Sequence, residues 1–197
     1  MARKVTASDD ELIERLAKTF TDYGYDGASL TILSAATGLQ RASLYHRFPG
    51  GKEEMAARVL KVINTLVTKS IVEPLSSEGM SFEEKISHLL AQFDYLYRGG
   101  KDSCVLNMLS HPISEQGPFS DAIKAIYHSL TDSIATAIEH SGVSKEIAEQ
   151  RTTTILSLLQ GGLVVSRGTG TTEPFKNALA EIERNLLLSV EIQQTGV

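Results

Sequence analysis

The chain has 197 residues, of which 42% are hydrophobic and 22% are charged. This balance is ordinary for a globular protein and argues against a disordered one, while the single cysteine, Cys104, excludes an intrachain disulfide. No uncharged apolar run approaches the ~20 residues of a membrane span, and the N-terminus turns acidic where a signal peptide would be apolar. We therefore expect a cytoplasmic protein.

The net charge of −5 is unevenly distributed along the chain. Residues 1–61 carry nine Lys or Arg and eight Asp or Glu, a net charge of +1, whereas residues 62–197 carry ten and sixteen, a net charge of −6. The acidic part argues against a general polyanion binder. The near-neutral part can still bind nucleic acid if its cations share one face, because phosphates respond to locally clustered charge. Scattered surface charge is the alternative.

Apolar residues recur at spacings of three and four along almost the whole chain, which predicts an all-α protein of about nine helices. A capping box at Ser8–Glu11 begins the first helix, and Gly24 ends it. The next three helices are expected at residues 29–37, at residues 40–46, and from Gly51 to about Pro74.

A second capping box, Ser81 with Glu84, begins a fifth helix that is expected to end at Gly99. The last four helices are expected at 104–110, at 118–142, at 144–167 and from Glu173 onward. The short links between the helices predict a small N-terminal head on a larger helical bundle.

The second and third helices, joined by a tight glycine turn, have the pattern of a helix-turn-helix motif. The third helix is expected to be anchored to the core by Leu44. Four side chains fan over roughly 140° on the opposite side of this helix: Arg41, Ala42, Tyr45 and His46.

These side chains have the chemistry to contact a DNA duplex. Arg41 can donate a bidentate pair to guanine, Ser43 can reach a base or a phosphate, and Ala42 is small enough to let the helix approach the groove floor. The helix termini on either side offer further phosphate contacts. The full predicted DNA-binding set is Ser29, Thr31, Gln40, Arg41, Ala42, Ser43, Tyr45, His46 and Lys52. The alternative is that Tyr45 and His46 pack between helices and Arg41 forms surface ion pairs.

Residues 9–62 resemble the DNA-binding head of the TetR family of bacterial repressors. The resemblance lies in Phe20, Tyr23-Gly24-Tyr25, Thr31 through Leu39, Ser43-Leu44-Tyr45-His46-Arg47-Phe48, and Lys52-Glu53. It implies a homodimer whose two recognition helices read a palindromic operator under the control of a small ligand. It also implies a tetR-type helix-turn-helix domain at residues 1–50, extending into the fourth helix to about residue 62, and a ligand-binding and dimerisation domain at residues 51–197.

Three segments are similar to the LmrA/YxaF-like branch of that family: Phe48–Glu54, Ser103–Asn107 and Leu159–Leu163. Two positions depart from the family pattern. Gln40 stands where relatives often have serine or another capping residue, so the third helix is expected to begin less sharply. Thr31 is short where relatives often carry a longer polar side chain, which puts a base contact from it in doubt.

The body offers aromatic and thioether side chains with few polar groups, which suits a small amphiphilic or aromatic effector. The predicted effector-binding residues are Phe93, Tyr97, Cys104, Met108, His111, Tyr127 and Leu159. Plain core packing is the alternative for each of them.

The last two helices carry more apolar surface than one bundle edge needs, which predicts an intermolecular four-helix bundle. The predicted dimer residues are Ile155, Leu158, Gly162, Leu163, Ile182, Leu186 and Val190. A mid-helix glycine costs about 1 kcal/mol relative to alanine, so the Gly161-Gly162 pair indicates a close backbone approach across a two-fold axis or inside a pocket. A simple kink is the alternative.

Enzymatic motifs are not found. The histidines lack metal-ligand spacing, no nucleophile elbow occurs, and the segment 167–171 has neither a Walker lysine nor a GxGxxG pattern. We therefore expect a ligand-responsive repressor without metal or cofactor, whose partners are operator DNA, a small effector and a second copy of the chain. An activator or ligand-independent DNA-binding protein of the same fold, and a carrier or enzyme with a vestigial head, are the alternatives.

Overall fold

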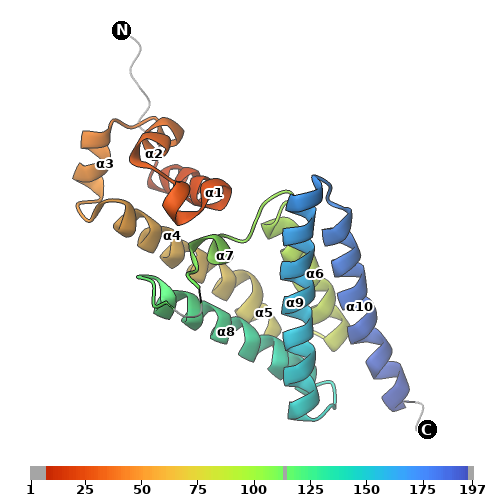
Figure 1. Ribbon diagram of the computed structural model, residues 1–197. Helices are drawn as coiled ribbons and strands as arrows, with labels where there is room; N and C mark the ends of the chain where they lie inside the picture. The colour runs from red at the N-terminus through yellow and green to blue at the C-terminus, as the bar shows by residue number, and fades with distance from the viewer. Residues whose placement is uncertain (1–7, 113–114, 195–197) are drawn as a thin grey trace. The chain divides into compact units, whose positions relative to one another are not determined.

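The computed structural model describes residues 8–112 and 115–194, with side chains described as far as Leu186. The secondary-structure elements of these residues are all helices, without strands (Figure 1). The helices are α1 (Asp9–Gly27), α2 (Leu30–Thr37), α3 (Arg41–Arg47), α4 (Gly51–Val67), the π-helical segment η1 (Thr68–Val72), α5 (Glu73–Leu75), α6 (Phe82–Leu96), α7 (Val105–Leu109), α8 (Ser120–Glu139), α9 (Lys145–Thr169) and α10 (Glu173–Gln194).

Because α4, η1 and α5 follow one another without a break, the described part of the chain contains nine separate helical stretches. The prediction of an all-α protein of about nine helices is therefore confirmed. The described residues form two compact units. The first comprises the chain up to residue 64 together with 105–123, and the second comprises 65–104 together with residues from 124 onward.

The first unit is built around large apolar side chains that the helical periodicity directs inward. Leu12, Leu16 and Phe20 of α1 are buried, as are Leu33 of α2 and Leu44 of α3, and α2 packs on both α1 and α3. Ser8 begins α1 by accepting a hydrogen bond from the Glu11 amide, as the capping box predicts.

The end of α1 differs from the sequence prediction. Gly24, with a φ of 70°, kinks α1 instead of ending it, and the helix continues to Gly27. A side chain at Gly24 would approach the Cε atom of Met108, since a Cβ there would lie 3.4 Å from it. Gly24 therefore serves both a left-handed backbone conformation and close packing of α7 on α1.

The second unit contains the antiparallel hairpin of α9 and α10, whose closure depends on Phe175. This ring is fully buried, and its backbone amide donates to Ser166 Oγ at 3.1 Å. Cβ atoms built at Gly100 and Gly162 would lie 2.7 Å from Phe175 Cβ and 3.1 Å from its Cα, respectively. The two glycines therefore make room for Phe175.

The continuous stretch from α4 to α5 contains one irregular turn. In η1 the Glu73 amide donates to the Thr68 carbonyl, five residues back. Pro74 has no N–H, so it cannot serve as the usual helical donor to the carbonyl of Ser70. Instead, Nε2 of His88 in α6 lies 2.8 Å from that oxygen. The imidazole supplies a hydrogen bond that proline removes, provided that Nε2 carries the proton.

Among the described residues, none of the helices is both long enough and apolar enough to cross a bilayer.

Candidate nucleic-acid interface

The turn between α2 and α3 is fixed by local hydrogen bonds. Ser29 begins α2 by accepting a hydrogen bond from the Ile32 amide at 3.3 Å. Gly38 ends the helix in a left-handed conformation with a φ of 71°, and its amide donates to the Ser34 carbonyl. Ser34 Oγ in turn donates to the Leu39 carbonyl at 2.6 Å. This network sets the direction in which α3 leaves the turn.

Helix α3 rests on the head through one residue of its own. Leu44 is completely buried, and Phe48, directly after the helix, is 5% exposed. The other six α3 residues are exposed, including Tyr45 at 46% and His46. The arrangement in which Tyr45 and His46 pack between helices is therefore not the one observed.

The start of α3 is less sharply capped, as Gln40 predicts, because no side-chain hydrogen bond caps it. Arg41, the first residue of α3, donates through Nη2 to Oγ1 of Thr31 in α2. Both side chains are exposed, and the contact spans ten residues of sequence. The contact joins the two helices of the motif on their exposed side.

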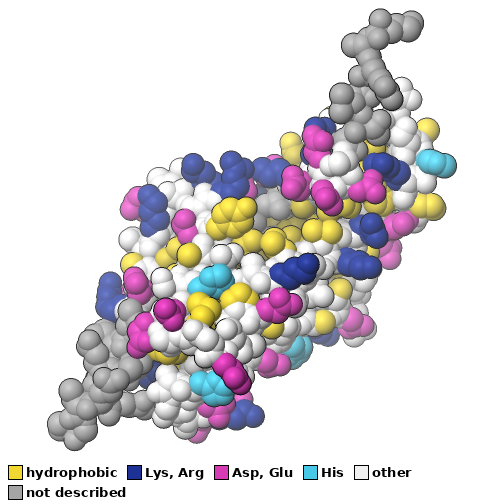
Figure 2. Space-filling model, turned by 180° about the vertical axis from the view of Figure 1, so that it is seen from behind, with side chains coloured by type: hydrophobic (Ala, Val, Ile, Leu, Met, Phe, Trp, Pro, Cys, Tyr) yellow, Lys and Arg dark blue, Asp and Glu magenta, His cyan; other side chains and the backbone are white. Residues whose placement is uncertain are grey.

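Arg47, the last residue of α3, forms an ion pair with Asp9 at 3.0 Å. Arg41 contrasts with Arg47 because its partner is a neutral hydroxyl, which leaves the guanidinium charge uncompensated by that contact. On the face shown in Figure 2, Lys and Arg side chains alternate with Asp and Glu side chains instead of forming one basic field. This distribution favours a few directed contacts over general polyanion binding.

Lys52 is half-buried and already has partners. Its ammonium donates to the Tyr25 carbonyl at 2.9 Å and lies 4.3 Å from the centroid of the Tyr25 ring. That ring packs against Phe20 and Phe119. Burial, followed by the charges of nearby acids, raises the pKa of Tyr25. Lys52 thus fastens the start of α4 to the end of α1.

Three of the predicted effector residues come together in the second unit. The Tyr97 hydroxyl donates to Cys104 Sγ at 3.6 Å, and Tyr127 also hydrogen-bonds to Cys104. Gln160 hydrogen-bonds to Tyr97. Burial raises the pKa of both tyrosines, and the neighbouring thiol raises it further. These four residues are called the tyrosine–cysteine cluster below. Sequence reasoning missed Gln160, because a glutamine inside an apolar helical pattern does not reveal its partner.

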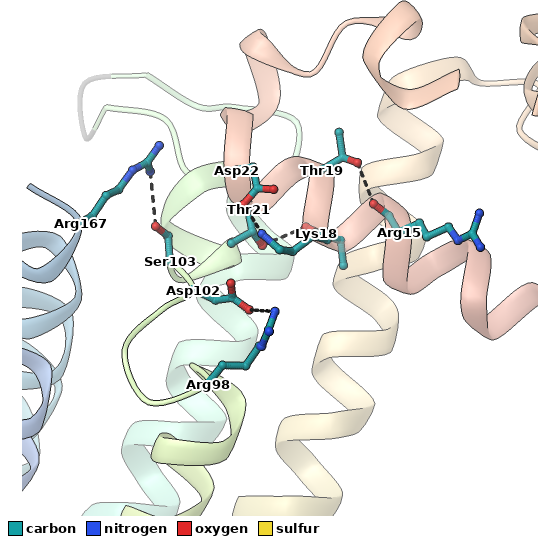
Figure 3. A network of polar contacts seen from close by, with 10 residues as sticks. Arg15, Lys18, Thr19, Thr21, Asp22, Arg98, Asp102, Ser103 and Arg167 are labelled. Carbon is teal, nitrogen blue, oxygen red and sulfur yellow. Dashed lines mark hydrogen bonds and ion pairs between the residues drawn. The ribbon is translucent and has the colours of Figure 1, made fainter. Parts of the chain in front are cut away.

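An ion pair and a hydrogen bond hold the loop that leads to Cys104, as Figure 3 shows. Arg98 pairs with Asp102 at 3.6 Å, and Arg167 of α9 donates to Ser103 Oγ at 3.4 Å. Arg98 itself adopts a left-handed conformation with a φ of 50°, which is uncommon outside glycine. The loop is therefore tied to α9 immediately before the cysteine.

The remaining predicted effector residues do not join this cluster. Phe93 and Leu159 are each 1% exposed and belong to the apolar core. Met108 and His111 belong to the first compact unit, where Met108 packs on Gly24. A hollow of about 750 Å³ lies elsewhere in the second unit, between α8 and α9. Its lining includes Asp132, Glu139, Glu149 and four threonines, and none of the predicted effector residues.

Most of the predicted dimer residues are buried within the chain itself. The side chains of Ile155, Leu163, Ile182 and Leu186 are all at most 4% exposed, so their apolar surface is already covered. Gly162 is also buried, against α10, Leu158 is half-buried, and the side chain of Val190 lies outside the described residues.

Different residues of α9 are exposed. Val164 is 57% exposed and Val165 is 49% exposed. Gly161 and Gly168 flank them, and a Cβ built at either glycine meets no neighbouring heavy atom within 4 Å among the described residues. We call Gly161, Val164, Val165 and Gly168 the α9 stripe. Sequence analysis already indicated a close approach at Gly161, but it did not single out Val165 and Gly168, because adjacent apolar residues, 163 to 165, gave no indication of which faced α10.

Comparison with known proteins gives matches over most of the chain. Residues 12–59 match the model of the bacterial regulatory proteins of the tetR family, and residues 84–181 match that of the transcriptional regulator LmrA/YxaF-like C-terminal domain. The HTH-type transcriptional regulator LmrA of Bacillus subtilis is 21% identical over 170 residues, which cover 81% of this chain and 86% of that protein.

Solved structures share the fold. A TetR transcriptional regulator from Legionella pneumophila superimposes with a TM-score of 0.75 at 20% identity, covering 91% of this chain and 97% of that one. The TetR family regulator CifR, in a structure that includes its complex with a 26-base-pair operator, gives a TM-score of 0.66 at 22% identity. That alignment covers 93% of this chain and 98% of CifR.

Proposed function

Because the chain belongs to the TetR family of transcriptional regulators, in its LmrA/YxaF-like branch, we propose that it is a ligand-responsive repressor acting in the cytoplasm. In this proposal a homodimer binds a palindromic operator and is released by a small amphiphilic or aromatic effector. The head, residues 1–50 with an extension into α4 to about residue 62, contacts DNA, and residues 51–197 bind the effector and the second subunit. The observation that carries the proposal is the exposed polar face of α3, which rests on buried Leu44.

DNA reading is assigned to α3. Arg41 donates a bidentate pair to guanine in the major groove, and its small neighbour Ala42 allows the close approach. Ser43, Tyr45 and His46 contact phosphates or base edges from the same exposed face. Gln40, Ser29 at the start of α2 and Thr31 within it contribute from the rim of that face.

Lys52 contacts a phosphate without leaving Tyr25. An ammonium has three donors, and the Tyr25 carbonyl takes one of them. The remaining donors are available to a phosphate at the start of α4. In this arrangement DNA binding does not require the head to give up the contact between α4 and α1.

The second subunit is proposed to pack on the α9 stripe. Two exposed valines flanked by two glycines allow a second helix to approach closely, because the glycines have no Cβ in the way. For its two α3 helices to enter successive major grooves on one face of the duplex, the dimer must hold them about 34 Å apart.

The effector is proposed to bind beside the tyrosine–cysteine cluster. Buried hydroxyls, a thiol and an amide provide directed hydrogen bonds without charge, which suits a neutral polar group on an otherwise apolar molecule. Lowering operator affinity 100-fold requires the effector to prefer the non-binding conformation by about 2.7 kcal/mol.

Selection of bound duplexes from random-sequence DNA with the full-length chain tests the proposal. We expect one palindromic sequence to be enriched, and a mobility-shift assay to show binding that weakens with salt.

Arg41→Ala is expected to cost about 1–3 kcal/mol of binding free energy and to relax one base preference, whereas Lys52→Ala weakens binding to all sequences alike and reduces the slope of log affinity against log salt by about one. Enrichment of no sequence contradicts the proposal and favours the carrier or enzyme.

The direction of regulation is tested separately, by transcription in vitro from a promoter that overlaps the selected operator. A repressor lowers the transcript yield, and an activator or a ligand-independent regulator is recognised by a raised yield or by indifference to every effector tried. Phenolic compounds, which carry a neutral hydroxyl on an apolar ring, are suitable first probes for release from DNA.

A further inference from the structure

Thr31 contacts Arg41, the residue proposed to read a base. Its hydroxyl oxygen accepts a hydrogen bond from Nη2 of Arg41, so the residue that begins α3 is held by the second residue of α2. Resting on the proposed function, we infer that Thr31 is a positioning residue that sets base specificity by fixing the Arg41 guanidinium.

The hydrogen-bonding capacity of both groups supports this role. A guanidinium has five N–H donors, and the contact with Thr31 uses one of them, so enough remain for a bidentate pair with a guanine. A hydroxyl has one donor and two acceptor sites. Accepting from Arg41 leaves the Thr31 proton available for a DNA phosphate at the start of α2. One neutral side chain can therefore join a phosphate on one side to the base-reading arginine on the other.

The choice of a neutral partner has an electrostatic consequence. A carboxylate in the place of Thr31 would also hold Arg41, but its charge would repel the phosphates and compensate the cation. Arg47 illustrates that case, since it is paired with Asp9. Thr31 orders the guanidinium of Arg41, and the full positive charge of that guanidinium remains available to DNA.

The length of Thr31 fits the same role. A long polar side chain at this position would reach the duplex by itself, whereas threonine is short and its hydroxyl is engaged by Arg41. Thr31 therefore acts on base recognition through Arg41 and has no base contact of its own. Both side chains are exposed, so removal of the hydroxyl should leave the stability of the head nearly unchanged.

The test compares Thr31→Val, which keeps the shape and removes the hydroxyl, with Thr31→Ser, which keeps the hydroxyl. For wild type and both variants, binding is measured to the selected operator and to duplexes that carry every single base-pair change. Thr31→Val is expected to lower the preference at the base pair that Arg41 reads by roughly five- to tenfold, while the other positions keep their preferences. Thr31→Ser should stay within about twofold of wild type.

Arg41→Ala and the double variant Thr31→Val/Arg41→Ala complete the design. Once Arg41 is removed, Thr31→Val should no longer change the base-preference profile, because its effect operates through the arginine. The slope of log affinity against log salt should be unchanged in Thr31→Val, since no cation is lost. Thermal unfolding of each variant serves as the control for folding.

Three results would overturn the inference: a wild-type profile for Thr31→Val, a loss that is equal at every base pair, or a Thr31→Ser variant as defective as Thr31→Val. The first would mean that Arg41 is ordered by DNA alone, and the second that Thr31 contacts only a phosphate. Failure of the wild-type chain to select any sequence would overturn the proposed function together with this inference, and is therefore distinguishable from a failure of Thr31 alone.

Discussion

Helices α3 and α9 each have a buried and an exposed side, but these sides have different origins. Helix α3 has seven residues and buries one of them, Leu44, so nearly all of its side chains are exposed wherever the neighbouring helices lie. Helix α9 has 25 residues and packs along α10, which covers its larger apolar side chains and leaves the smaller α9 stripe uncovered. The exposed side of a short surface helix thus follows from its own sequence, whereas that of a long core helix depends on its neighbours.

The largest effect is expected where α3 has its only buried residue. Leu44→Ala should lower the free energy of unfolding by about 2–5 kcal/mol, because it leaves a cavity under α3. Tyr45→Ala, next to it but exposed, should change stability by no more than about 0.5 kcal/mol and still weaken operator binding. Urea unfolding followed by circular dichroism measures both. A Tyr45→Ala variant as unstable as Leu44→Ala would mean that α3 rests on more than one side chain.

The two adjacent glycines of α9 sharpen the comparison within one helix. A Cβ at Gly162 would lie 2.9 Å from Ala178 Cβ, so the steric cost of Gly162→Ala, about 1–3 kcal/mol, should exceed the ~1 kcal/mol gained in helix propensity. Gly161→Ala meets no such neighbour and should stabilise the isolated subunit by up to about 1 kcal/mol.

Sedimentation velocity then separates the fold from the assembly. If the α9 stripe is the dimer surface, Gly161→Ala should weaken dimerisation while its subunit is stabilised. A Gly161→Ala variant that dimerises like wild type at every concentration would contradict the assignment of the second subunit to this stripe.

A smaller effect is expected at His88, which contacts the irregular turn before α5. His88→Ala should cost about 1 kcal/mol, because the Ser70 carbonyl then loses its donor. Pro74→Ala restores an N–H to the helix, so His88→Ala should cost clearly less in that background. Unfolding of the four proteins in this double-mutant cycle gives the coupling energy. Equal costs of His88→Ala in the two backgrounds would show that proline and histidine act independently.

The smallest effect at neutral pH concerns Tyr97. Burial raises the pKa of Tyr97 above the ordinary value of 10.0, so the unfolded chain loses this proton at lower pH than the folded chain does. The unfolded state then binds fewer protons, and stability should fall as the pH rises above about 10. Tyr97→Phe should flatten this fall. If the unfolding free energies of wild type and Tyr97→Phe change equally between pH 9 and 11.5, the burial of the Tyr97 phenol is contradicted.

The same distinction between local and distant causes explains what the sequence could predict. The capping boxes, the glycine at the end of α2 and the exposed face of α3 follow from residues close together in the chain, and all were predictable. The packing of Met108 on Gly24 was not, because the two residues are far apart in the chain, and neither was the contact of Gln160 with Tyr97. For Ile182, helical periodicity correctly placed the side chain on an apolar face, but it could not tell whether that face met α9 or a second subunit.

The π-helical turn has a consequence for reading related sequences. One such turn accommodates a single extra residue in an α-helix, so every side chain after it is rotated by about 100° relative to an uninterrupted helix. A relative without this π-helical turn is therefore expected to align with a one-residue deletion near it, and a relative without the proline at position 74 to have no need of a donor at position 88. An alignment forced through this stretch without a gap would assign the wrong inward-facing positions to the whole of α5.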